Sequence, residues 1–139
     1  MMDVFIVENS SAMRASLQSV LSDMPEVKVV GQAVSETVAA ERIGALLPDV
    51  VILDHRLQSG SGVRLLENIM NRHAMIKVIV FTYYNDEFSM DNCKLTGADY
   101  CFDKSFQLMH LRAILWKWAH TDRLNNMLLL NSQLNSSPH

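Results

Sequence analysis

Short runs of aliphatic and β-branched residues alternate with longer amphipathic segments along the whole chain. The apolar runs predict strands at 3–7, 27–34, 49–53, 77–82 and 99–104. Alternation of strands and helical segments at this spacing is typical of βαβ units, which build a parallel sheet with helices on both faces. We therefore predict a doubly wound α/β fold with five parallel strands.

The segment DVVILDHRLQSGSG, residues 49–62, begins with one of these strands. Its consecutive aliphatic residues show no alternation with polar ones, so both faces need apolar cover, as in the centre of a parallel sheet. An acid, Asp54, follows directly. An aspartate in this place is either a turn or capping residue or part of a site.

The segments between the strands predict helices. An apolar stripe at helical spacing follows the first strand, and Ser10 or Ser11 can cap that helix. The second helix begins near Ser35 and is stopped by Pro48, and the third follows the glycines of the segment quoted above. A fourth is expected at roughly 85–96.

The last helix begins near Ser105 and is the most apolar. One stripe consists of Leu108, Leu111, Leu115 and Trp118. Met109 and Trp116 lie on a different side, which is either a wider core face or a surface for a partner. We expect one domain over 1–120, followed at 121–139 by a tail that either extends the helix into a homodimer contact or stays unfolded.

The composition is that of an ordinary soluble domain, with 139 residues, 15 acids, 12 bases and a net charge of −3. Lys and Arg are scattered singly, so no direct binding of nucleic acid is expected. The chain shows neither a membrane span nor a signal-peptide pattern, and we expect a cytoplasmic protein without a membrane partner. Cys93 and Cys101 lack metal spacing and the density of a disulfide framework, so free thiols are expected.

Polar residues follow the predicted strands. Glu8 and Asn9 follow the first strand and Asp54 the third, while Thr82 ends the fourth and Lys104 the fifth. In the flavodoxin-like order 2-1-3-4-5 these groups meet at one edge of the sheet, with Asp54 at the centre. The oxygens of Glu8, Asn9 and Asp54 suit a hard divalent cation. A cation, a hydroxyl and an ammonium there would neutralise phosphoryl oxygens if Asp54 attacked a phosphoryl donor.

This combination resembles the receiver domain of bacterial two-component response regulators, over roughly residues 3–120. The resemblance is carried by the acidic turn after VFIV, Met13-Arg14, the segment around Asp54, and the motifs VIVFT and GADYCFDKS. It implies that Asp54 accepts a phosphoryl group from a histidine kinase or phosphotransfer protein and that Mg²⁺ is required. No effector domain follows within the sequence, so we expect a stand-alone regulator whose output is contact with a downstream protein partner.

The resemblance also assigns roles to individual residues. Glu8 and Asn9 match the acidic pair that, with the phosphoacceptor and the backbone carbonyl of Arg56, binds the metal. Thr82 matches the switch hydroxyl and Lys104 the phosphate-binding lysine.

Arg56 and Tyr84 match positions that flank the attacking water, where they either slow self-dephosphorylation or simply point into solvent. Met109 and Trp116 are the expected output surface.

The sequence departs from the family pattern at three positions. Asn9 replaces the usual metal-binding aspartate, which predicts weaker Mg²⁺ binding because one ligand charge is lost. Ser105 stands where a proline commonly follows the lysine, so we expect a trans peptide there. Cys101 occupies the place of an aromatic switch, and its neighbour Tyr100 should point to the other face of the strand.

Three functions remain open at this stage. The leading one is a phosphoacceptor switch in a phosphorelay. The second is a pseudo-receiver, an interaction module whose binding ignores phosphorylation because Asn9 has weakened the chemistry. The third is a small phosphatase with Asp54 as a transient nucleophile, which is disfavoured because Arg56 stands where such enzymes need a second acid.

Overall fold

The structure is a computed structural model that describes residues 1–57, 59–82, 96–103 and 108–135, with no side chain described at residue 82 or beyond residue 121. One parallel sheet contains the strands β1 (Met2–Val7), β2 (Val27–Ala33), β3 (Val50–Asp54), β4 (Lys77–Thr82) and β5 (Tyr100–Asp103). The helices are α1 (Ser11–Ser22), α2 (Glu36–Leu46), α3 (Gly62–Arg72) and α5 (Leu108–Asn135). The strand order is β2-β1-β3-β4-β5, which confirms the flavodoxin-like prediction. Most of the helix expected at 85–96 lies outside the described residues.

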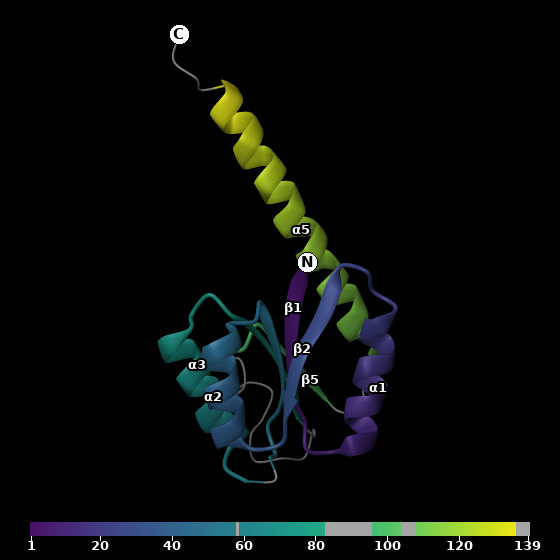
Figure 1. The fold of residues 1–139 in the computed structure, drawn as a ribbon, viewed down its shortest axis with the longest axis vertical. Coiled ribbons are helices and arrows are strands. Elements are labelled where there is room, and N and C mark those ends of the chain that lie inside the picture. Colours follow the sequence, from purple (N-terminus) through teal and green to yellow (C-terminus); the bar gives the residue numbers. More distant parts are fainter. Residues whose placement is uncertain (58, 83–95, 104–107, 136–139) are drawn as a thin grey trace.

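The sheet is covered on both faces, by α2 and α3 on one side and by α1 and α5 on the other (Figure 1). Because strand side chains alternate with a period of two, β3 contributes to two separate cores. Val51 and Leu53 pack in the core under α2 and α3, and Val50 and Ile52 in the core under α1 and α5. All residues of β3 are buried, as the unbroken aliphatic run predicted.

Serine side chains cap three of the helices. They accept the backbone N–H three residues along, at Ser10–Met13 (3.2 Å), Ser35–Val38 (3.3 Å) and Ser61–Arg64 (3.3 Å). Of the two candidates at the first helix, Ser10 is therefore the cap. The C-cap of α2 is Leu47, which adopts a left-handed conformation with φ of 47° directly before Pro48.

α5 packs on the sheet through its first half and then leaves the domain (Figure 1). Leu111, Leu115 and Trp118 are buried, whereas Met109 is 67% and Trp116 53% exposed. The alternative that Met109 and Trp116 belong to a wider core face is therefore wrong. From the sequence, residues 121–139 could either extend the helix or stay unfolded. The helix continues to Asn135, so it is extended over most of this segment. None of the described helices is long and apolar enough to cross a membrane.

Neighbouring residues of β5 face opposite cores. Tyr100 packs on the α1 and α5 side, where its ring lies 5.6 Å from that of Trp118, and Cys101 packs on the α2 and α3 side. This confirms that Tyr100 points away from the face that Cys101 occupies. Cys101 is disulfide-bonded, so the expectation of a free thiol is wrong for this residue, while Cys93 lies outside the described residues.

Candidate functional site

Two buried carboxylates lie next to each other at the carboxyl edge of the sheet. β1 and β3 are paired with Val7 opposite Leu53, so the next residues along, Glu8 and Asp54, are neighbours. Glu8 is 1% and Asp54 3% exposed, and they are the only buried charged residues in the described part of the chain. Two adjacent carboxylates in a medium of low dielectric constant repel each other, and a cation between them would offset that repulsion.

Backbone N–H groups hold both carboxylates in place. Asp54 Oδ1 accepts the Arg56 N–H at 3.0 Å, and Glu8 Oε1 accepts the Ser10 N–H at 3.0 Å. These bonds form within two residues of each acid, because the chain turns sharply at the end of each strand. The carboxylates are thereby presented on rigid strand ends with fixed orientations.

Arg14 shapes the turn after β1. Its Nη1 donates to the backbone carbonyl of Glu8 at 2.8 Å and to that of Asn9 at 3.2 Å. Met13-Arg14 is part of the family resemblance, but this role of Arg14 was not predicted from the sequence. An arginine in the first turn of the helix that follows an acidic strand end is the signal that could have identified it.

The donor set at this edge fits a hard divalent cation. It consists of the two carboxylates, the amide oxygen of the exposed Asn9 and the backbone carbonyl of Arg56, all of them oxygens of the kind that Mg²⁺ prefers. Among the described side chains there is no group of three or more His, Cys, Asp or Glu able to hold a metal ion. Two carboxylates supply less ligand charge than three would, so we still predict that Mg²⁺ binds weakly here.

The remaining predicted site residues are only partly described. The backbone of Thr82 ends β4 and pairs with Asp103 of β5, next to the Asp54–Phe81 pair. Its side chain is outside the described part of the chain, as are Tyr84 and Lys104. The structure therefore brings together Glu8, Asn9, Asp54 and Arg56 and places the backbone of Thr82 at the same edge.

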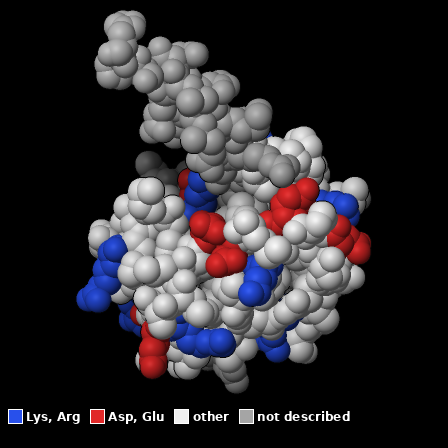
Figure 2. Space-filling view, turned by 45° about the horizontal axis from the view of Figure 1, so that its top comes forward, with Lys and Arg blue, Asp and Glu red and all other residues white. Residues whose placement is uncertain are grey.

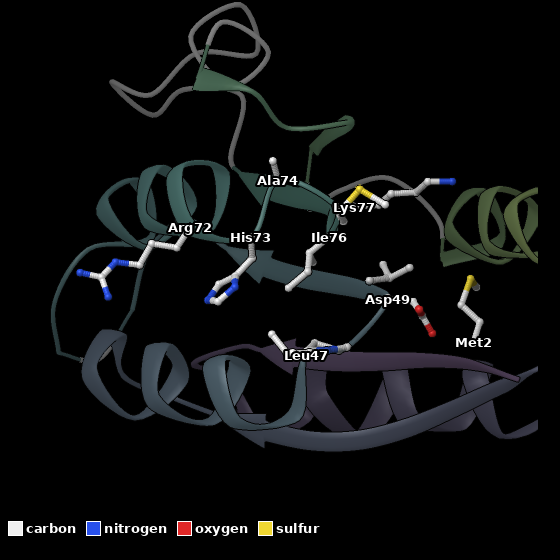
Figure 3. Close-up of a pocket in the computed structure, with 11 residues that line it drawn as sticks. Met2, Leu47, Asp49, Arg72, His73, Ala74, Ile76 and Lys77 are labelled. Atoms are coloured by element: carbon white, nitrogen blue, oxygen red, sulfur yellow. The ribbon is translucent and has the colours of Figure 1, made fainter.

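A cavity of about 560 Å³ lies at the opposite, amino-terminal edge of the sheet (Figure 3). Its polar side chains do not converge. Asp49 accepts the Asp3 N–H at 2.7 Å, Lys77 lies 4.9 Å from the centre of the Trp118 ring, and Arg72 points away from the other lining residues. Ligand sites combine apolar walls with convergent polar groups, so this cavity lacks one of their two components.

Charged residues of both signs are interspersed on the face shown in Figure 2. The described part of that face has no continuous basic surface of the kind that binds a nucleic acid backbone.

A family model, the response regulator receiver domain, matches residues 4–116. The DNA-binding transcriptional activator DevR/DosR of Mycobacterium tuberculosis is 33% identical over 127 residues, which is 91% of this chain and 58% of that protein. A protein-glutamate methylesterase/protein-glutamine glutaminase of Vibrio vulnificus is 32% identical over 101 residues, which is 71% of this chain and 29% of that protein. The chain thus spans little more than half of the one relative and under a third of the other.

Solved structures show the same fold. The signal receiver domain of a putative LuxO repressor protein from Vibrio parahaemolyticus superposes with a TM-score of 0.78 at 20% identity, covering 91% of this chain and 96% of that one. The response regulator domain of Thermotoga maritima CheB has a TM-score of 0.72 at 25% identity, covering 87% and 95%. The doubly wound fold and the match over residues 4–116 together define a receiver class of domain. The chain belongs to the response regulator receiver domain family. Receiver domains interact with histidine kinases or phosphotransfer proteins and generally bind Mg²⁺ at the phosphorylation site.

Proposed function

We propose that this protein is a phosphoacceptor switch of a two-component phosphorelay, phosphorylated on Asp54. The observation that carries the proposal is the buried Asp54 carboxylate, held by the Arg56 N–H on a rigid strand end beside Glu8. A carboxylate without a function is rarely buried next to a second one, because each must be removed from water.

In the proposed reaction one Asp54 carboxylate oxygen attacks phosphorus. The bond from phosphorus to the donor's histidine nitrogen, or to the acyl oxygen of a small phosphodonor, breaks as the new O–P bond forms, and the leaving group takes its electron pair. Mg²⁺, held by Glu8, Asn9, Asp54 and the Arg56 carbonyl, would neutralise charge on the transferred group. We assign Thr82 and Lys104 to the phosphoryl oxygens.

The same proposal gives Arg56 and Tyr84 a part in the lifetime of the phosphorylated state. Arg56 is exposed two residues after Asp54, where a long side chain can shield the acyl phosphate from water. Slow self-dephosphorylation is the expected consequence.

Labelling by a small phosphodonor tests the proposed function directly. The purified chain, incubated with acetyl phosphate and Mg²⁺, should gain the mass of one phosphoryl group in an intact mass spectrum. A well-characterised receiver labelled in parallel serves as the positive control. If the control gains the group and this chain does not, the switch proposal fails under those conditions.

Asn9 favours one alternative, a pseudo-receiver that binds its partner regardless of phosphorylation. Restoring the carboxylate with Asn9→Asp should lower the Mg²⁺ concentration for half-maximal labelling by roughly tenfold, because affinity for hard cations follows ligand charge. Titration of Mg²⁺ at a fixed acetyl phosphate concentration measures this. Labelling that appears only in the variant would favour the pseudo-receiver, and an unchanged midpoint would show that residue 9 does not contribute to the metal site.

We further propose that the output is a protein contact made by α5, including association with a second copy of the chain. Met109 and Trp116 are exposed on the side of α5 that faces away from the sheet, and the Trp116 ring stacks on that of His120 with centroids 3.8 Å apart. Exposed aromatic and methionine side chains are typical of contact surfaces.

Trp116→Ala should weaken a contact made through this face by roughly tenfold or more, because tryptophans in interfaces carry a large share of the binding energy. Sedimentation analysis over a range of protein concentrations measures self-association of the chain before and after phosphorylation. The matched control is Val38→Ala, which removes an exposed apolar side chain, 47% exposed, from α2 on the other face. Self-association that Trp116→Ala leaves unchanged would exclude this face as the contact between copies.

A further inference from the structure

A chain of hydrogen bonds joins the start of α2 to the loop that follows Asp54. Oε1 of Glu36, the first residue of α2, accepts the Ser61 N–H at 2.7 Å, Arg64 Nε at 3.1 Å and Arg64 Nη2 at 3.0 Å. The Glu36 N–H in turn donates to the Ser59 carbonyl at 2.9 Å. α2 and α3 lie side by side (Figure 1), and Glu36 and Arg64 connect them at the end nearest Asp54.

The same loop is also connected to Asp54, through the contact between Ser61 and Arg56. Ser61 forms an isolated antiparallel bridge with Arg56, whose N–H is the donor to Asp54 Oδ1. The Gly62 N–H closes the loop by donating to the His55 carbonyl at 3.2 Å. The connection therefore runs from Glu36 to the Ser61 N–H, across the bridge whose hydrogen bond joins the Gly62 N–H to the His55 carbonyl, and from Arg56 to the carboxylate of Asp54.

We call the contacts of Glu36 with Ser61 and Arg64 the clamp. The hydrogen bond from the Ser61 N–H is its stronger part. The Glu36 side chain is 25% exposed and that of Arg64 68%, so solvent screens the ion pair and its own contribution is small. A backbone N–H bound to a carboxylate is a charge-assisted hydrogen bond and is stronger. The Ser61 N–H first, and Arg64 second, hold the pKa of Glu36 below its ordinary value. The clamp is therefore formed at neutral pH and is lost as the pH falls through that lowered pKa.

Close packing at residue 60 accompanies the clamp. Gly60 has a φ of 89°, and a Cβ on it would lie 2.4 Å from the Glu36 Cβ. Only glycine combines that conformation with that approach. The loop is thus shaped to bring Glu36 against Ser61.

We propose that Glu36, assisted by Arg64, is a positioning residue for Asp54, which acts by holding Ser61 and, through it, the Arg56 N–H that orients the carboxylate. This inference rests on the proposed function, because it concerns the same phosphoacceptor. Linkage makes any effect on the equilibrium reciprocal: if the clamp shifts the equilibrium between phosphorylated and unphosphorylated Asp54, phosphorylation of Asp54 shifts the equilibrium of the clamp by the same free energy. The conformation of the α2–α3 face then depends on the phosphorylation state, so this face is a second surface, separate from α5, that a partner can use to recognise that state.

The first experiment compares Glu36→Ala with wild type in labelling and in amide exchange. Labelling by acetyl phosphate should slow by roughly threefold to tenfold, and the Ser61 and Arg56 amides of the unphosphorylated protein should exchange faster by a similar factor, as expected when a charge-assisted hydrogen bond is lost. Glu36→Gln keeps an acceptor oxygen and should recover part of both effects. The matched control is Glu41→Ala, an exposed glutamate on the same helix, which should leave both unchanged.

Amide exchange separates a failure of this inference from a failure of the proposed function. If wild type is labelled and Glu36→Ala is labelled at the same rate, the clamp does not position Asp54 although the switch stands. If wild type is not labelled, the proposed function fails. If, in addition, Glu36→Ala speeds amide exchange at Ser61 but not at Arg56, the positioning role of the clamp fails as well. Should Glu36→Ala not fold, Arg64→Met leaves the Ser61 bond in place and should give a smaller change in the same direction, and no change in either measurement would count against the proposal.

Discussion

Replacing Asp54 with asparagine should abolish labelling by acetyl phosphate completely. An amide oxygen is too weak a nucleophile to attack phosphorus, whereas asparagine has nearly the volume of aspartate and can still accept the Arg56 N–H that Oδ1 accepts at 3.0 Å. The fold should therefore persist while the reaction is lost. Intact mass spectra before and after incubation measure the adduct, and circular dichroism confirms that the variant is folded.

A second aspartate serves as the control for Asp54. Asp23→Asn changes an exposed residue at the carboxyl end of α1, remote from the carboxyl edge of the sheet, and should be labelled like wild type. An Asp54→Asn protein that gains a phosphoryl group would show that another side chain is the acceptor. In that case the role assigned to the buried pair of Glu8 and Asp54 would have to be abandoned.

Gly62→Ala should lower the free energy of unfolding by about 2 kcal/mol or more. A Cβ at this position would lie 2.6 Å from both Cα and O of His55 and 2.7 Å from the carbonyl oxygen of Asp54. These are backbone atoms, which cannot rotate away as a side chain can, so α3 or the end of β3 has to move. Because that movement displaces the residues around Asp54, the labelling rate should fall together with the stability.

Gly44→Ala is the matched control, because it makes the same chemical change inside a helix with room for the methyl group. The nearest atom to a Cβ at residue 44 is His73 Nε2, at 4.0 Å. Alanine is favoured over glycine in a helix interior, so this variant should be more stable than wild type by about 0.5–1 kcal/mol. Chemical denaturation of both variants gives the two values. Equal effects in the two variants would contradict the close approach at Gly62.

The fold could be predicted from the sequence because each part of it has a local signal. The aliphatic run Val50–Leu53 predicts a strand buried on both faces, and Ser35 and Pro48 mark the two ends of α2. The adjacency of Glu8 and Asp54 follows from strand order alone, since neighbouring parallel strands end at the same edge.

The features that could not be predicted depend on pairs of residues far apart in the sequence. Glu36 and Arg64 are 28 residues apart, and neither stands out from other surface charges in its own segment. The disulfide bond of Cys101 gave no signal either, because two cysteines are too few to show a spacing pattern. The sequence left the exposure of Met109 and Trp116 open, because helical spacing separates two sides of α5 without saying which neighbours cover them.

The projecting half of α5 has the geometry of a lever arm (Figure 1). Trp118, the last buried residue of α5 among the side chains that the structure describes, contacts the Tyr100 ring of β5 and the Lys77 ammonium. From there to Asn135 the helix extends by roughly 25 Å. A tilt of about 10° at that fulcrum displaces the far end by about 4 Å, as the length of a rigid helix requires. If the Trp118 ring repacked, the resulting tilt would therefore move the far end of the helix by a distance comparable to the radius of a helix, at a point well outside the domain.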